Sequence, residues 1–319
     1  MPQQLPIVDS HHHLWMRGGQ RYLLEEFTAD IAASGLDVRA SVYVESGAMY
    51  CRSGPEHLRC VGEAEFAAGM AAMSESGGFG PTRACAAFVG AADLTLGSAV
   101  DEVLDVLESA SGGRLRGIRG AVASDPDPAV NVGGRAHAPA GLMLEPRYRA
   151  GVGRLAARGL VYDAWQFHPQ LPEVCSLADA FPDLTIVVNH CGAPLGIGRY
   201  SREASYQPWR ALIADLARRP NIHMKLGGMS RRRCGFDFED RPVAPSVEEL
   251  ADAWRPYMHP CLEHFGVERC IYESNFPPDR VAGSYGDVWK ALRLTASGCS
   301  EDEQRALFAG TASRVYRIG

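Results

Sequence analysis

Ile7-Val8-Asp9-Ser10-His11-His12-His13-Leu14-Trp15 is the stretch of sequence that decides the fold. Its apolar start predicts a short buried β-strand, which three consecutive histidines then follow. Because side chains alternate across a strand, His11 and His13 are expected on one face and His12 on the other. Two imidazoles from a single strand can therefore reach a common atom.

Similar short apolar runs recur along the chain, each followed by a Gly/Pro-rich or polar stretch and then a helical pattern. Together they predict eight strands, at residues 7–9, 40–44, 84–89, 115–119, 160–165, 185–188, 222–226 and 270–273. Repeated βα units in this number predict an α/β fold, the (β/α)₈ TIM barrel, as a single domain over residues 1–319.

The intervals between these strands carry helical periodicity and are unequal in length. Helices are predicted at 100–109, 208–217 and 247–265, and Pro256 and Pro260 are expected to break or kink the last of these. The connections that follow strands are the long ones, as at 121–146, 191–207 and 227–246. In a barrel these loops all lie at the C-terminal face, so an active site is expected there.

Composition excludes several functional classes. A formal charge of -6 and a pI near 5.9 argue against a nucleic-acid partner, since the densest cationic run, Arg231–Arg233, is too short to follow a phosphate backbone. The sequence has neither a leader-like start nor an apolar run of roughly 18 residues, so a cytoplasmic protein without a membrane span is expected.

The nine cysteines form no C-x-x-C pair and are expected to be reduced thiols. The sequence leaves a homo-oligomer open.

Two more histidines close predicted strands. His168 ends the fifth and His190 ends the sixth, so both are expected at the rim where His11 and His13 lie. Each histidine taken alone also fits a structural role, but four at one rim indicate a site.

Candidate substrate-binding residues surround the same predicted rim. Cationic and hydroxyl side chains there suit a carboxylate or a lactone oxygen, with Arg119 and Lys225 favoured by their strand-end positions. The full set of cationic and hydroxyl candidates is Arg116, Arg119, Lys225, Tyr50 and Arg52. Trp15, Trp165 and Phe276 fit either aromatic walls or core packing. A small-molecule substrate is therefore expected.

These motifs together resemble the amidohydrolase superfamily over residues 7–316. The resemblance rests on His11-x-His13, His168, Asn189-His190-x-Gly192, Lys225-Leu226-Gly227-Gly228 and Glu273-Ser274-Asn275-Phe276-Pro277. It is nearest to the branch of sugar lactonases, 2-pyrone-4,6-dicarboxylate lactonase and the aminocarboxymuconate-semialdehyde decarboxylase type. The resemblance implies divalent-metal ligands at His11, His13 and His168, and a substrate-polarising or proton-shuttling histidine at His190.

The sequence departs from that pattern at the eighth strand. Where metal-using members place an aspartate that acts as general base, this chain has Asn275, whose amide cannot take a proton near neutral pH. Three imidazoles can still hold one divalent ion such as Zn²⁺, or the site can work without metal. His190 is the best candidate base in either version, and Glu273 or Asp279 can supply the missing carboxylate.

Three hypotheses about function follow. The first is a hydrolase that opens a lactone with an activated water, using His190, Asn275, His168 and Lys225 at the catalytic centre. The second is a non-oxidative decarboxylase or related lyase, which Asn275 disfavours because that reaction relies more on metal and carboxylate. The third is a barrel that binds a ligand without catalysis, and the four rim histidines argue against it.

Overall fold

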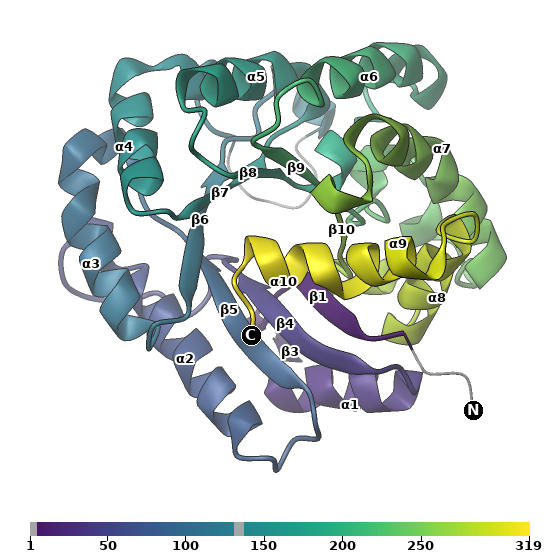
Figure 1. Cartoon of the computed structure of the whole chain (residues 1–319), viewed down its shortest axis with the longest axis horizontal. Coiled ribbons are helices and arrows are strands. Elements are labelled where there is room, and N and C mark those ends of the chain that lie inside the picture. Colours follow the sequence, from purple (N-terminus) through teal and green to yellow (C-terminus); the bar gives the residue numbers. More distant parts are fainter. Residues whose placement is uncertain (1–4, 131–136) are drawn as a thin grey trace.

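The barrel sheet of this computed structural model, which describes residues 5–130 and 137–319, has eight parallel strands in the order of the chain (Figure 1). Residues 1–4, and residues 131–136 of the predicted 121–146 loop, lie outside the described residues. The predicted (β/α)₈ architecture is confirmed. The strands are β1 (Ile7–His12), β4 (Val38–Val44), β5 (Arg83–Gly90), β6 (Leu115–Ala121), β7 (Val161–Trp165), β8 (Ile186–Val188), β9 (Ile222–Leu226) and β10 (Cys270–Tyr272).

The first and last strands come together through side chains and residues beyond β10, so the barrel is nearly closed. The buried carboxylate of Asp9 accepts hydrogen bonds from the Ser274 hydroxyl at 2.6 Å and from its backbone N–H at 3.0 Å. The Asn275 N–H donates to the carbonyl of His11 at 2.9 Å. The residues of the eighth-strand motif are thereby fixed directly beside the histidines of β1.

Helices cover the outside of the barrel. They are α1 (Leu24–Ser34), α2 (Val61–Glu75), α3 (Val100–Ala110), α4 (Pro146–Ala157), α5 (Leu171–Ala180), α6 (Arg202–Leu216), α7 (Val247–Phe265), α8 (Tyr285–Thr295), α9 (Glu301–Arg305) and α10 (Thr311–Val315). Helix α6 begins six residues before its predicted start at 208. The predicted break in α7 is wrong: the helix runs through Pro256 and Pro260, because its apolar face, including Trp254 and Met258, is buried.

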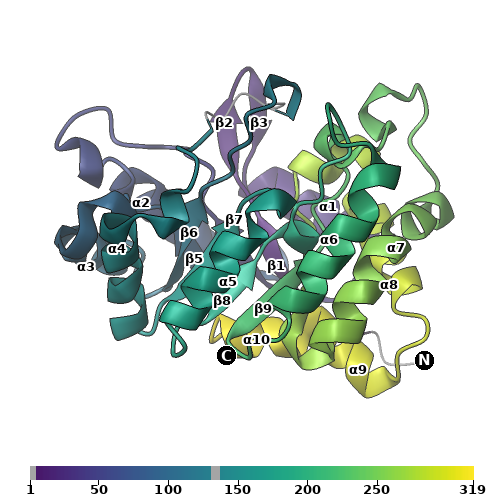
Figure 2. The ribbon, with the colours of Figure 1, turned by 90° about the horizontal axis from the view of Figure 1, so that it is seen from above.

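A two-stranded hairpin that was not predicted from the sequence follows β1. Its strands, β2 (Trp15–Arg17) and β3 (Gln20–Tyr22), pair antiparallel across Gly18 and Gly19. Both glycines have positive φ, 58° and 77°, which a two-residue hairpin turn of this kind requires. In Figure 2 the hairpin lies at the end of the molecule opposite α9 and α10.

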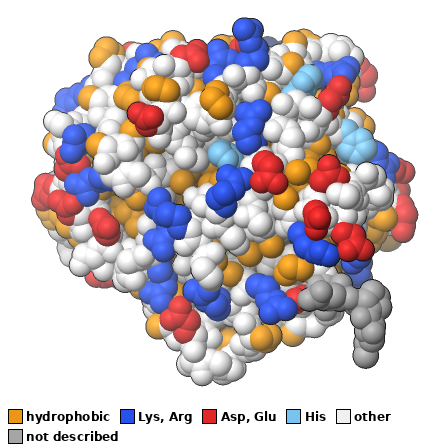
Figure 3. Space-filling view, in the orientation of Figure 1, with side chains coloured by type: hydrophobic (Ala, Val, Ile, Leu, Met, Phe, Trp, Pro, Cys, Tyr) orange, Lys and Arg blue, Asp and Glu red, His pale blue; other side chains and the backbone are white. Residues whose placement is uncertain are grey.

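The C-terminal segment covers the end of the barrel where the strands begin. Val315 and Tyr316, at and just after the end of α10, pack with apolar residues early in the strands, such as Val8 and Val161. Figure 3 shows the molecule in the orientation of Figure 1, and acidic and basic side chains are intermingled on that face. The opposite end, where the strands finish, is left for the site.

Candidate active site

The last residues of β1 and His13 directly after it bring two buried imidazoles to one face, as the alternation predicted. The Nε2 atoms of His11 and His13 lie 3.2 Å apart, and Nδ1 of His13 lies 2.7 Å from the carbonyl oxygen of Val44. His12 points the other way, and its ring stacks on Phe27 with centroids 4.2 Å apart. Burial, and next to it the charge of Arg119, lowers the pKa of His13 well below its ordinary value, so this ring is neutral.

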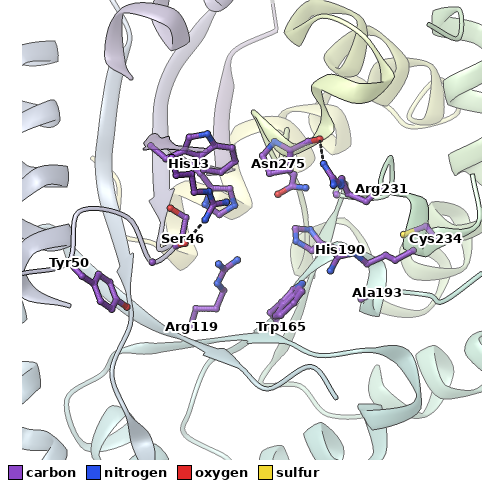
Figure 4. Close-up of a pocket in the computed structure, with 16 residues that line it drawn as sticks. His13, Ser46, Tyr50, Arg119, Trp165, His190, Ala193, Arg231, Cys234 and Asn275 are labelled. Carbon is purple, nitrogen blue, oxygen red and sulfur yellow. Dashed lines mark hydrogen bonds between the residues drawn. The ribbon is translucent and has the colours of Figure 1, made fainter. Parts of the chain in front are cut away.

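His190 and Glu273 form a hydrogen-bonded dyad at the floor of the site. Nδ1 of His190 lies 2.6 Å from Oε1 of Glu273, and the backbone N–H of His190 donates to the same oxygen at 3.2 Å. Glu273 is fully buried, whereas the His190 ring lines a cavity (Figure 4). A histidine bonded through Nδ1 to a carboxylate keeps Nε2 available to accept a proton, which is the arrangement that hydrolytic dyads and triads use.

Two glycines after β9 make room for this dyad. A Cβ on Gly228 would lie 1.9 Å from Nδ1 of His190, and one on Gly227 would lie 2.4 Å from the carbonyl oxygen of Glu273. Gly228 also has a φ of 65°, a conformation that L side chains rarely adopt. The Lys225-Leu226-Gly227-Gly228 motif therefore allows the close approach of β9 to the dyad.

Lys225 lies beneath the histidines in a buried polar network. Its ammonium group is 2.8 Å from Oδ1 of Asp163 and 3.4 Å from Nδ1 of His11. Asp163 also accepts from Asn189 and from the hydroxyl of Tyr316, each at 2.8 Å. Because Lys225 is fully buried and ion-paired, it supplies a fixed positive charge under the site rather than a group at its surface.

One buried oxygen beside His11, Oε2 of Glu273, has no hydrogen-bond partner among the described residues. Burial, followed by the charge of Lys225, lowers the pKa of His11 well below its ordinary value, so a neutral ring has one N–H for two nitrogens. Oε2 of Glu273 lies 2.8 Å from Nδ1 of His11, yet it makes no hydrogen bond. His11, His190 and Glu273 offer ligand atoms within 4.8 Å of one another, and this group can hold a metal ion.

Asn275 lies beside the dyad and cannot be its base. Its side-chain N–H donates to Oδ1 of Asp279 at 2.8 Å, and the Ser230 hydroxyl donates to the other oxygen of Asp279 at 3.0 Å. Burial raises the pKa of Asp279 to about 6. Of the two carboxylates considered in place of the aspartate, Glu273 contacts His190, whereas Asp279 orients Asn275.

A cavity of about 470 Å³ lies at the strand ends in front of these residues. Figure 4 shows His13, His190 and Asn275 on one side of it, with Arg119 and Trp165 facing them. Nε of Arg119 is 2.7 Å from Oε1 of the buried Glu45, so this guanidinium group is held in place. Further lining residues include Trp15, Arg17, Ser46, Tyr50, Arg231, Arg233 and Cys234.

One predicted metal ligand, His168, is not part of the group that can hold a metal ion among the described residues. The structure groups His11 with His190 and Glu273 rather than with His168. Nδ1 of His168 accepts the Leu195 N–H at 3.1 Å, which occupies one of its two possible ligand atoms. Burial lowers the pKa of His168 to about 4, so its ring is a neutral, packed group.

Three predicted substrate-binding residues also need correction. Arg116 is the second residue of β6, which extends to Ala121, so it lies at the start of the strand and not near the mouth. Arg52 is exposed and is absent from the described lining of the cavity. Phe276 is fully buried and packs edge-on against Tyr285, with ring centroids 5.3 Å apart. Phe276 therefore belongs to the core.

Three of the arginines that line the cavity were not predicted as site residues from the sequence: Arg17, Arg231 and Arg233. Arg17 reaches the cavity from the unpredicted hairpin, and Arg231 and Arg233 reach it from the loop after β9. Gly18-Gly19 between short apolar and polar runs was an available signal for the hairpin. No comparable signal distinguishes Arg231 and Arg233 from a solvated cationic run.

A family model described as Amidohydrolase matches residues 8–318. The chain belongs to the amidohydrolase family. An L-fucono-1,5-lactonase of Burkholderia multivorans is 27% identical over 98% of this chain and 96% of its own length. A protein y4mH of Sinorhizobium fredii and an L-fucono-1,5-lactonase of Burkholderia ambifaria are 31% and 29% identical, and the chain spans about half of each, 52% and 55%.

Solved structures of other proteins share the fold. An amidohydrolase from Burkholderia multivorans, described with bound zinc, superimposes with a TM-score of 0.73 at 24% identity over 98% of this chain and 99% of that one. A putative 2-pyrone-4,6-dicarboxylic acid hydrolase from Pseudomonas putida gives 0.62 at 18% identity, covering 99% of both chains. In the present chain, over the residues that the structure describes, no helix is both long enough and apolar enough to cross a membrane.

Proposed function

We propose that this member of the amidohydrolase family opens lactones by hydrolysis. The observation that carries the proposal is the His190–Glu273 dyad, 2.6 Å apart, at the floor of a cavity whose described lining contains arginines and no carboxylate. The lactonase names of several relatives, including one matched over nearly its whole length, support the same reaction class. A small-molecule substrate fits a cavity of about 470 Å³.

In this reaction Nε2 of His190 accepts a proton from a water molecule as the water oxygen bonds to the lactone carbonyl carbon. The proton on Nδ1 of His190 stays on the ring and remains hydrogen-bonded to Glu273, whose negative charge stabilises the imidazolium that forms. Arg119, held by Glu45, and the buried charge of Lys225 stabilise negative charge that develops on the carbonyl oxygen. The ring C–O bond then breaks, and the departing alkoxide takes the proton from His190.

The residues present also fit a divalent metal ion. Oε2 of Glu273 lies 2.8 Å from Nδ1 of His11, and this oxygen has no hydrogen-bond partner among the described residues. A divalent ion would be held by His11 and by Oε2 of Glu273, while His190, the other residue of the group, stays bonded to Oε1 of Glu273. When bound, such an ion would lower the pKa of a water and polarise a carbonyl. Oε1 of Glu273 remains the atom that orients His190.

A product assay tests the proposed reaction class. Purified protein is incubated with a panel of five- and six-membered lactones and, separately, with aromatic and enoic carboxylic acids, while acid release and CO₂ release are followed. We expect acid release from at least one lactone, with one solvent oxygen in the new carboxylate when the reaction is run in ¹⁸O-water. CO₂ release without lactone opening would instead identify a decarboxylase, and binding without either product would identify a ligand-binding barrel.

A further inference from the structure

The arginine run after β9 is divided between the site and the surface. Arg231 and Arg233 line the catalytic cavity, whereas Arg232 between them is exposed and lies 3.3 Å from Asp240. Alternation along this segment thus turns every second guanidinium group inward. The run therefore contributes two cations to the cavity that His190 also lines.

A second cavity of about 690 Å³ adjoins the first on this side. The two share Trp15, Arg17, Arg231, Arg233 and Pro278 as a common wall. Among the described residues that line either cavity there is no aspartate or glutamate. An arginine-lined space without acidic side chains attracts an anionic ligand.

Arg233 differs from its neighbours in how its charge is balanced. Nε of Arg231 lies 3.1 Å from Glu239, and Nη2 of Arg280 lies 3.3 Å from Asp30. Within residues 5–130 and 137–319, by contrast, no carboxylate lies within ion-pair distance of Arg233, and its buried Nε has no hydrogen-bond partner. A partly buried cation without a counter-ion calls for an anion from outside the chain.

The surroundings of Arg233 favour a planar anion. Its guanidinium carbon lies 5.4 Å from the ring centroid of Trp165, which forms a wall of the same cavity. A guanidinium group can donate two parallel hydrogen bonds to a carboxylate, and an aromatic ring beside it offers a surface for a flat ligand. His190 lines this cavity too, so one small molecule can contact both residues.

We propose that Arg233, with Arg231 beside it, binds a carboxylate of the substrate, so the substrates are lactones that carry a carboxylate outside the ring ester. This inference rests on the proposed lactone hydrolysis and adds the substrate class. The ring carbonyl lies at His190 while the free carboxylate lies at Arg233. Neutral sugar lactones lack the group that Arg233 would bind and are expected to be poor substrates.

The test compares two lactones that differ in one substituent. 5-Oxotetrahydrofuran-2-carboxylate carries the carboxylate, and 5-(hydroxymethyl)dihydrofuran-2-one carries a neutral hydroxymethyl group on the same ring. We expect wild-type kcat/KM to favour the carboxylate by about 10- to 100-fold, the range that a hydrogen bond to a charged group supports. Arg233→Gln should lose this preference through a rise in KM for the anionic lactone that is about 10-fold or more larger than any change for the neutral one.

Arg232→Gln is the matched control, because it removes a neighbouring charge that is paired with Asp240 at the surface. It should leave both substrates unaffected, and Arg233→Lys should restore part of the preference by returning the charge without the planar fork. Equal wild-type activity on the two lactones, unchanged in Arg233→Gln, would overturn the carboxylate subsite while leaving lactone hydrolysis intact.

A binding arm separates this inference from the proposed function. Calorimetric titration with 2-hydroxyglutarate, the open product of the carboxylated lactone, requires no turnover. Binding to wild type that weakens at least 10-fold in Arg233→Gln but not in Arg232→Gln supports the subsite even if no lactone is opened. Equal affinity in all three proteins contradicts it.

Discussion

Nδ1 of His190 lies 2.6 Å from Oε1 of Glu273, and this carboxylate is fully buried two residues before Asn275. The acid of the site thus lies one layer deeper than the position where the family resemblance expects an aspartate. Its negative charge acts on substrate through His190 instead of directly. The change at Asn275 therefore leaves the site with a base, provided that His190 keeps its orientation.

Glu273→Gln should abolish most activity while keeping the shape of the side chain. The glutamine amide can donate to Nδ1 of His190, which places the proton on Nε2 and leaves no lone pair facing the cavity. We expect kcat to fall by about 10²- to 10⁴-fold, as measured by initial rates of lactone opening. Asp279→Asn alters a buried carboxylate that bonds to Asn275 instead of His190, and it should cost much less. Equal losses in the two variants would remove the special role of Glu273.

Gly228→Ala should displace His190. The added Cβ would lie 1.9 Å from Nδ1 of His190, so either the ring or β9 must move. We expect at least a 100-fold loss of kcat/KM, since small misplacements of catalytic groups have effects of this size. Gly266→Ala is the control, because Gly266 has a similar φ of 71° and a Cβ added there would meet nothing within 4 Å. It should cost about 1–3 kcal/mol of stability and little activity. Full activity in Gly228→Ala would show that the contact is not needed.

Zinc binding distinguishes the ligand set implied by the family resemblance from the group in the structure. Metal-free protein is titrated with Zn²⁺, and His11→Gln should bind the ion more than roughly 100-fold more weakly than wild type. Loss of a residue that only hydrogen-bonds to a ligand costs up to about 100-fold, and loss of a ligand itself should cost more. His168→Gln should retain wild-type affinity, because His168 is outside the group formed by His11, His190 and Glu273. Because His11 belongs to both ligand sets, loss of zinc binding in His168→Gln is the result that would contradict this assignment.

His168 should make stability depend on pH. Burial lowers its pKa from 6.5 to about 4, so between these values the unfolded chain binds a proton that the folded chain does not. Stability therefore falls as pH is lowered through this window, and the contribution of His168 between pH 7 and pH 5 is about 2 kcal/mol. Urea unfolding at the two pH values should show a correspondingly smaller difference in His168→Gln. His57→Gln, a change at the surface, should keep the wild-type difference, and an unchanged difference in His168→Gln would contradict the assignment.

The sequence was sufficient to predict the barrel and the positions of three histidines of the site, His11, His13 and His190. Strand periodicity placed His11 and His13 together, and the strand ends located His190, because alternation and βα order are local properties. Arg116 was misplaced because the end of β6 was set two residues early. The pairing of Glu273 with His190 depends on a contact between residues 83 positions apart, which no local pattern encodes.

Three arginines that line the cavity could not be placed there from local sequence patterns either. A Gly-Gly turn could have revealed the hairpin that carries Arg17, since both glycines need positive φ. Arg231 and Arg233 were not predicted as site residues, because the sequence does not show which way a loop side chain points. Only the folded loop separates them from Arg232, which pairs with Asp240.

The role of His190 as the base is tested most directly by the kcat of His190→Asn on a lactone that the wild-type protein opens, with circular dichroism confirming that the barrel is folded. Asparagine keeps a polar side chain at the cavity but cannot accept a proton at neutral pH. We predict a loss of at least 100-fold in kcat in a folded variant. A folded His190→Asn protein that opens the lactone at the wild-type rate would contradict this role.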